Sequence, residues 1–296
     1  MIKLEPVLDI VESTVWTGVI DGEKPLSVML IASVGSGKSE ILRKTYKPPK
    51  ITEVWKDKTD RDGNKRKEKE VNVHHIGSVL YTTDTTPYTL YHRYGDLLKS
   101  GQIKHIVIPD FLTILTKSID VMPATVGFYN SLIEEGICRI ESKHSDFITD
   151  IPVRIGLITA VSHQDYTERS RKQNWGAMGF LSRVLPVSFR YSDNTKNEIL
   201  TSIFLRQYRD EKDFDLKLPS SPIAVEMPTQ FLDSVKAFSF VLRDQSDEVG
   251  ARRLKQIMSL MMGNALKNGR DIVTQEDVDK ILGYEKFFSN ECRAIL

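Results

Sequence analysis

The chain contains little cysteine, almost no net charge and no long hydrophobic run, and each shortage excludes a class of protein. Its two cysteines, Cys138 and Cys292, lie far apart in the 296 residues, so they form neither a disulfide framework nor a metal-ligand spacing. We expect a small buried side chain at Cys138 and a near-terminal thiol at Cys292.

No apolar stretch approaches the roughly 20 residues that cross a bilayer, and residues 1–9 lack the basic-then-apolar layout of a signal peptide. These absences predict a cytoplasmic protein with no membrane partner. The formal net charge of +1 predicts no general attraction to nucleic acid, so such binding would need a local basic patch.

What the chain does contain is a repeated alternation of short apolar runs and segments with helical spacing. The apolar runs are typical of strands at residues 27–32, 77–82, 105–108, 153–161 and 187–191. Strands that alternate with helices predict an α/β fold with a parallel sheet. From about Lys196 the strand pattern ends, and beyond residues 218–222 the spacing is helical. The sequence therefore predicts an α/β core over 1–205 and a smaller helical domain over 206–296.

Three helices are expected from their apolar spacing and their end signals. Residues 250–267 carry a continuous apolar stripe that stops before Gly269. Residues 274–282 open with the capping pattern of Thr274, and residues 122–136 carry Pro123 in the first turn.

An insertion at about residues 47–73 follows the first predicted helix of the core. Its ends, 51–55 and 71–73, are strand-like, its middle is highly charged, and residues 62–64 have turn composition. We expect a β-hairpin here. Because acids nearly balance the bases, a solvated hairpin is the plainer interpretation, and contact with nucleic acid or a partner is the other.

The segment Ala-Ser-Val-Gly-Ser-Gly-Lys-Ser at 32–39 ends the first predicted strand and opens a helix. Two glycines let successive backbone N–H groups point inward around a phosphate, the lysine reaches terminal phosphates, and the last serine holds Mg²⁺. The following helix adds its positive N-terminal dipole. This is the pattern of a P-loop for ATP with Mg²⁺, and its candidate ligands are Ala32, Gly35, Ser36, Gly37, Lys38 and Ser39. A flexible glycine turn is the plainer interpretation.

A second acidic residue is needed beside a P-loop to complete the Mg²⁺ shell. The apolar strand 105–108 leads to Pro109 and then Asp110, which makes Asp110 the candidate. Phe111 stands where a hydrolytic glutamate is expected next. In the alternative register Asp110 takes the glutamate's place and Pro109 the aspartate's, so one carboxylate is missing in either case.

At this point the chain resembles the AAA+ ATPases, in the branch of the MoxR-like ATPases and the minichromosome maintenance helicases. The resemblance rests on residues 35–42, on the helix ending in Glu-Glu-Gly at 126–136, and on residues 151–162. It implies a P-loop NTPase αβα sandwich with a C-terminal helical lid. It also implies that Ser162 is the polar sensor 1 residue, with His163 as the alternative.

The same resemblance implies roles for two arginines. Residues 179–183 are similar to the segment that carries the arginine finger, which makes Arg183 the finger for a neighbouring subunit. Arg252 is the sensor 2 candidate and Arg253 the alternative. A surface salt bridge is the plainer interpretation of Arg183.

The resemblance implies a ring-forming homo-oligomer, a hexamer being one such ring, that couples ATP to the remodelling of DNA or of DNA-bound protein. The alternative is a nucleotide-gated scaffold with little hydrolysis, which Phe111 favours. Retention of the catalytic arginines favours the ATPase. The inserted hairpin and the sequence around Asp110 indicate a divergent member, of the kind that a virus or mobile element encodes.

Overall fold

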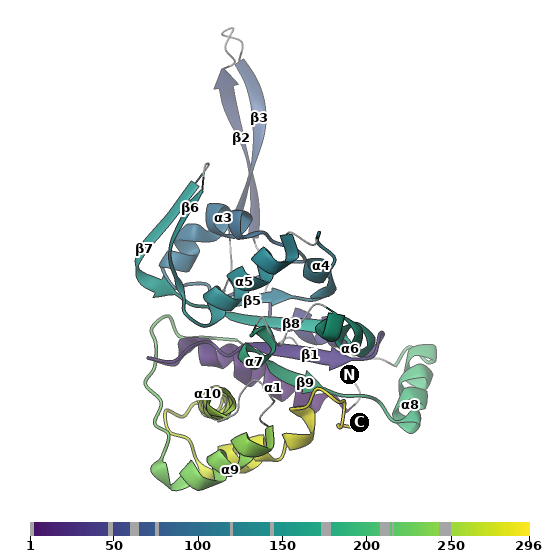
Figure 1. The fold of residues 1–296 in the computed structure, drawn as a ribbon. Coiled ribbons are helices and arrows are strands. Elements are labelled where there is room, and N and C mark those ends of the chain that lie inside the picture. The colour runs from purple at the N-terminus through teal and green to yellow at the C-terminus, as the bar shows by residue number, and fades with distance from the viewer. Residues whose placement is uncertain are drawn as a thin grey trace.

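The computed structural model describes residues 3–46, 50–59, 65–74, 77–118, 121–142, 145–172, 179–207, 214, 216–242 and 250–296. The fold is α/β, with a five-stranded parallel sheet flanked by helices (Figure 1). The strands lie in the order β4 (Val79–Tyr81), β5 (His105–Ile108), β8 (Gly156–Ser162), β1 (Val28–Ala32) and β9 (Leu185–Ser188).

The interior strand β1 is apolar throughout because helices cover both faces of the sheet. Its residues are all buried, and successive side chains of a strand point to opposite faces. Val28 and Leu30 accordingly belong to one hydrophobic core, and Met29 and Ile31 to a second core on the other face. This double burial explains a run of strand formers without polar alternation.

One core joins the sheet to the first helix and to helices from the C-terminal part of the chain. It includes residues of α1 (Glu5–Trp16), α9 (Leu232–Leu242), α10 (Ala251–Lys267) and α11 (Gln275–Leu282). The helix α1 packs directly along α10. The hydrophobic core is therefore continuous across residue 205, where the sequence predicts a domain boundary.

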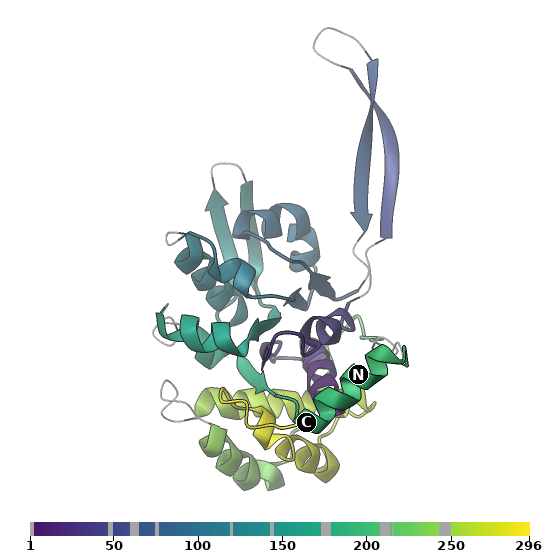
Figure 2. The same cartoon turned by 90° about the vertical axis from the view of Figure 1, so that its right-hand side faces the viewer.

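The second core lies under helices that connect the strands. It includes residues of α3 (Pro87–Lys99), α4 (Leu112–Leu115), α5 (Val121–Ile133), α6 (His163–Lys172) and α7 (Phe180–Arg183). In Figure 2, the teal helices of this layer lie on one side of the sheet, and the purple helices α1 and α2 (Lys38–Arg43) lie on the other.

Two hairpins and one peripheral helix complete the fold. The antiparallel strands β2 (Lys50–Thr59) and β3 (Lys65–His74) project from the body, as Figures 1 and 2 show. Strands β6 (Ile137–Ser142) and β7 (Ser145–Val153) form the other hairpin, and α8 (Asp193–Phe204) lies at the edge of the molecule. Single 3-10 turns occupy Thr17–Val19, Thr229–Phe231 and Glu285–Phe287.

Several predicted elements are confirmed, with changed bounds. The hairpin in the insertion is present, but its strands extend through most of the charged middle, and the predicted turn at 62–64 lies outside the described residues. The helix predicted at 122–136 ends at Ile133. The strand predicted over 153–161 is present as β8, but it begins only at Gly156, because Val153 ends β7.

The cysteines also differ from expectation. Cys138 is exposed on β6, whereas Cys292 is buried, and its Sγ lies 3.7 Å from the carbonyl oxygen of Ile31. The C-terminal segment packs beside the end of β9, where Arg190 N donates to Ala294 O at 2.9 Å. Among the described residues, no helix combines the length and apolar character of a membrane span.

Candidate functional site

The loop between β1 and α2 turns sharply at two glycines. Gly35 has φ of 76° and Gly37 has φ of 84°, in the left-handed region that disfavours other residues. A side chain at Gly35 would meet nothing within 4 Å, so the space beside this loop is open. The Tyr191 hydroxyl, from the segment after β9, donates to the Ser36 carbonyl at 2.9 Å and anchors the loop. The loop therefore has the conformation and the open side that a phosphate cradle requires.

Lys38 begins α2 and folds back over this loop. Its ammonium donates to the carbonyl oxygens of Ala32 and Ser33, each at 2.8 Å. Burial lowers the pKa of Lys38, and the charges of Asp110, Cys292 and Asp165 oppose that shift. A partly desolvated ammonium held by neutral carbonyls is a favourable partner for an anion, because phosphate oxygens offer it a charge-assisted bond.

The predicted magnesium ligands flank this lysine. Ser39 is exposed in the first turn of α2, and Asp110 is exposed just past the end of β5. Asp110 Oδ1 accepts a hydrogen bond from the backbone N–H of Leu112 at 2.9 Å, which orients the carboxylate. The described residues contain no group of three or more His, Cys, Asp or Glu side chains that could hold a metal. Mg²⁺ commonly uses one or two protein oxygens together with phosphates, so this donor set fits it.

Ser162 ends β8, which lies between β1 and β5. It pairs with Ala32 in the sheet register, so it stands directly beside the start of the P-loop segment. Its hydroxyl donates to Asp165 Oδ2 at 2.6 Å, and the backbone N–H of Asp165 donates back to Ser162 Oγ at 3.0 Å. His163, the alternative, is the first residue of α6. The structure thus brings Ser162, Asp110 and Lys38 to one edge of the sheet.

Phe111 points away from this edge. Its side chain is fully buried and stacks on Phe180 with ring centroids 5.0 Å apart. The position after Asp110 is therefore a core position and contributes nothing polar to the site.

Arg183 and Arg252 lie at the opposite end of the parallel strands, where β1 and β9 begin. Arg183 precedes β9, and Arg252 Nη1 donates to the hydroxyl of Ser182 at 2.9 Å. Both line a cavity of about 420 Å³ that also contacts Leu26 and Ser27, which come before β1, whereas the P-loop segment follows β1. Five residues of strand separate the two ends by about 15 Å.

This cavity is rich in positive charge. Its basic side chains are Lys24, Arg154, Arg183, Arg252 and Lys255, and its acids are Glu23 and Glu134. Burial acts to raise the pKa of Glu134, but the hydrogen bond from Lys24 and the charges of Lys24, Arg183 and Arg252 hold it below its ordinary value. The arrangement suits an anion, because cations exceed acids in a partly enclosed space.

Arg183 and Arg253 are held differently. Arg183 donates to the carbonyl of Gly179 at 2.8 Å and lies 3.4 Å from Glu135 Oε1, and its buried Nε has no partner among the described residues. Arg253 is only 2% exposed and donates to Val184 O at 3.1 Å and to Gln256 Oε1 at 2.7 Å. Arg253 therefore joins α10 to the sheet, whereas Arg252 faces the cavity.

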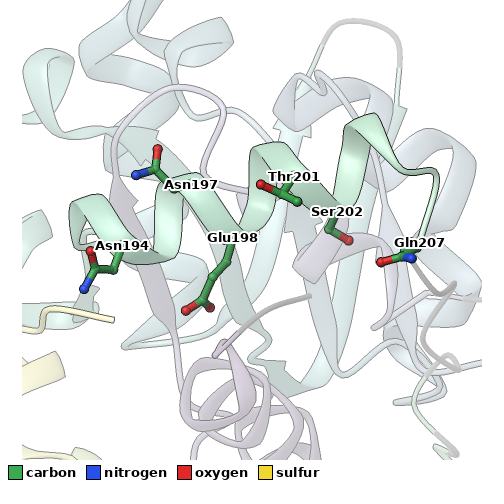
Figure 3. Close-up of a pocket in the computed structure, with 6 residues that line it drawn as sticks. All are labelled: Asn194, Asn197, Glu198, Thr201, Ser202 and Gln207. Carbon is green, nitrogen blue, oxygen red and sulfur yellow. The ribbon is translucent and has the colours of Figure 1, made fainter.

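A second hollow lies along the exposed side of α8 (Figure 3), with a volume of about 490 Å³. Asn194, Asn197, Glu198, Thr201, Ser202 and Gln207 line it. The one charged side chain of this lining is acidic, so the hollow does not suit a phosphate.

Sequence reasoning missed Asp165 and the basic neighbours of the two arginines. Asp165 follows Ser162 by three residues, which is the spacing of a capping pair at the start of a helix. That spacing could have pointed to Asp165. The clustering of Lys24 with Arg252 leaves no local signal, because the two residues come from distant parts of the chain.

Comparison of the sequence with models of known protein families finds no match, and comparison with curated proteins finds none either.

Proposed function

We propose that the chain is an AAA+-type protein that binds ATP with Mg²⁺ at residues 32–39. The observation that carries the proposal is the loop after β1, which has two left-handed glycines, open space beside Gly35 and the Lys38 ammonium bonded to its carbonyl oxygens. The loop amides and Lys38 would hold the phosphates, and Ser39 and Asp110 would hold the metal. Bound Mg²⁺ would supply positive charge to the phosphate oxygens. The proposal includes a P-loop NTPase αβα sandwich whose helices beyond residue 205 form a lid.

The positions of Arg183 and Arg252 favour an oligomer. Neither arginine reaches the P-loop segment of its own chain, which lies about 15 Å away across β1. In a head-to-tail assembly, the amino ends of the strands in one copy face the carboxyl ends of the strands in the next copy. The arginines of the first copy would then meet the phosphates bound to the second. Arginine suits this role because its guanidinium stays charged and offers several donors. A closed ring, hexameric or of another size, satisfies this geometry.

The remodelling of DNA or of a DNA-bound protein, and a cytoplasmic location, come to the proposal from the family resemblance and the sequence. A second function, a nucleotide-gated scaffold with little turnover, is favoured by the burial of Phe111. Without a carboxylate directly after Asp110, hydrolysis depends on another group.

Steady-state ATP turnover, measured with and without DNA, separates the two functions. The ATPase predicts turnover that Asp110→Asn lowers, whereas the scaffold predicts ATP-dependent assembly in sedimentation with no turnover. Neither assembly nor turnover with saturating ATP would contradict both.

A further inference from the structure

We propose that Asp165 supplies the second carboxylate of the nucleotide site. It takes the role that a carboxylate directly after Asp110 would have, because the chain has Phe111 at that position. The inference rests on the proposed function and names a further residue for the same reaction. Asp165 accepts the proton of the attacking water, and Ser162 is a positioning residue that holds its carboxylate.

The sheet topology places Asp165 at the correct edge. Strand β8 lies between the P-loop strand β1 and the Asp110 strand β5, and all three run parallel. Helix α6 begins directly after β8 and packs against β1. Because Asp165 lies in the first turn of α6, it is located between the loop and Asp110.

A short chain of contacts links Asp165 to Lys38. The Lys38 ammonium bonds to the Ala32 carbonyl at 2.8 Å, and Ala32 is the register partner of Ser162. Ser162 in turn bonds to Asp165 Oδ2 at 2.6 Å. The negative charges of Asp110 and Asp165 both act to raise the pKa of Lys38, against the effect of burial.

Ser162 holds Asp165 through two hydrogen bonds, of which one reaches the carboxylate. One is the hydroxyl bond to Oδ2 and the other is the backbone bond from Asp165 N to Ser162 Oγ at 3.0 Å. The hydroxyl bond limits the rotation of the carboxylate, and the backbone bond fixes the helical turn that carries it. Little entropy is then lost when the carboxylate aligns as a general base.

The proposed reaction is the hydrolysis of ATP. The water oxygen forms a bond to the terminal phosphorus as the bond from that phosphorus to the ADP oxygen breaks. The water proton passes to the Asp165 carboxylate and then to solvent, and the products are ADP and phosphate. Lys38 would offset negative charge on the phosphate oxygens, and so would the Mg²⁺ that Ser39 and Asp110 would hold.

The test compares Asp165→Asn with Glu168→Gln. Asparagine keeps an oxygen that accepts from Ser162, so folding should persist, and thermal unfolding checks this. Glu168→Gln removes the same charge from an exposed position on the same helix. We expect Asp165→Asn to lower kcat about 100-fold with the ATP Kd within about threefold of wild type. Glu168→Gln should change neither quantity.

Two further readouts separate catalysis from helix capping. Asp165→Glu should recover part of the lost kcat, because glutamate restores a carboxylate at this position. Ser162→Ala should lower kcat by a smaller factor, about threefold to tenfold, because it removes only the hydrogen bond that orients the Asp165 carboxylate.

Different results would contradict the proposed function and the role of Asp165. Wild type that binds no ATP with Mg²⁺ would contradict the proposed function and this inference together. Wild type that binds ATP without turnover, or Asp165→Asn that turns over like Glu168→Gln, would overturn the inference alone.

Discussion

The rings of Phe111 and Phe180 stack with their centroids 5.0 Å apart and their planes inclined by 1°. Both side chains are fully buried. This contact joins the residue after Asp110 to α7, the short helix that ends in Arg183. Phe111 therefore has a structural role, because it packs the segment after β5 against the helix that carries Arg183.

We predict that Phe111→Glu destabilises the protein and does not raise ATP turnover. The sequence alone suggests that a glutamate here would restore a hydrolytic carboxylate, but it would be buried without a partner. The expected loss is at least about 3 kcal/mol in the free energy of unfolding, measured by urea titration. Phe111→Leu, which stays apolar, should lose less. If Phe111→Glu were as stable as wild type and faster in turnover, the side chain at this position would be able to reach the site.

Asp9 should contribute to stability by joining α1 to the C-terminal helices. Its carboxylate accepts bonds from Lys267, from Lys280 at 2.9 Å and from the Tyr284 hydroxyl at 2.9 Å. We expect Asp9→Asn to lower the free energy of unfolding by about 2 kcal/mol at pH 7. Asp271→Asn, at an exposed position, should have little effect.

The effect of Asp9 should depend on pH. Burial acts to raise the pKa of Asp9, but Lys267 and Lys280 hold it below its ordinary value. A lowered pKa stabilises the fold above the unfolded value of about 3.9, and this contribution is lost as the pH falls through the folded value. The gap between wild type and Asp9→Asn should therefore narrow below about pH 4. A gap that stays constant down to about pH 2.5 would contradict the ion-pair account.

His105 should make the protein sensitive to acid. It is completely buried, its Nε2 lies 3.2 Å from the Leu26 carbonyl oxygen, and burial lowers its pKa to about 3. The unfolded chain binds a proton at about pH 6.5, so stability should fall by up to about 1.4 kcal/mol per pH unit as the pH drops below about 6.5.

Denaturant titrations of His105→Gln and of wild type between about pH 4 and about pH 7 measure this slope. The variant should lack that contribution, whatever its absolute stability. His92→Gln is the control, because His92 is exposed. An unchanged slope in His105→Gln would show that other groups cause the acid sensitivity.

Mixing experiments test whether Arg183 acts on a neighbouring copy. Arg183→Ala should bind ATP normally but lose turnover about 1000-fold, and Lys38→Ala should bind ATP at least about 100-fold more weakly than wild type. In an equal mixture about a quarter of the head-to-tail boundaries join an intact loop to an intact arginine, so some activity should return. Arg139→Ala, at an exposed position, should behave as wild type.

A strictly monomeric protein at saturating ATP would contradict the head-to-tail arrangement. So would a mixture that never recovers turnover. Arg183 would then be a structural residue that joins α7 to Glu135.

Strands β1 and β5 were predictable because burial on both faces requires continuous apolar runs. Residues 105–108 coincide with β5, and 27–32 differ from β1 by one residue. The break between Val153 and Gly156 was not predictable, because both sides of it are apolar. It depends on the pairing of β7 with β6, which is a tertiary relationship.

The candidate site was predictable where a residue has a local signal, either within residues 32–39 or, as for Asp110 and Ser162, at or just past the end of a buried strand. Local spacing identified residues 32–39, because the glycine turn and the lysine act together within one loop. The position of Arg252, at the end of the strands opposite to residues 32–39, depends on how α10 packs. The position of Asp165 at the same end of the strands as Lys38 depends on the order of the strands. Neither relationship leaves a pattern in the sequence.

Calorimetric titration of ATP with Mg²⁺ into wild type, Lys38→Ala and Arg43→Gln tests the central claim most directly. Arg43→Gln removes a positive charge from the exposed end of the same helix and serves as the matched control. We expect wild type and Arg43→Gln to bind with equal affinity, and Lys38→Ala to bind at least about 100-fold more weakly because it loses a charge-assisted bond. Equal affinity in Lys38→Ala, or no binding by wild type, would contradict the assignment of the nucleotide site.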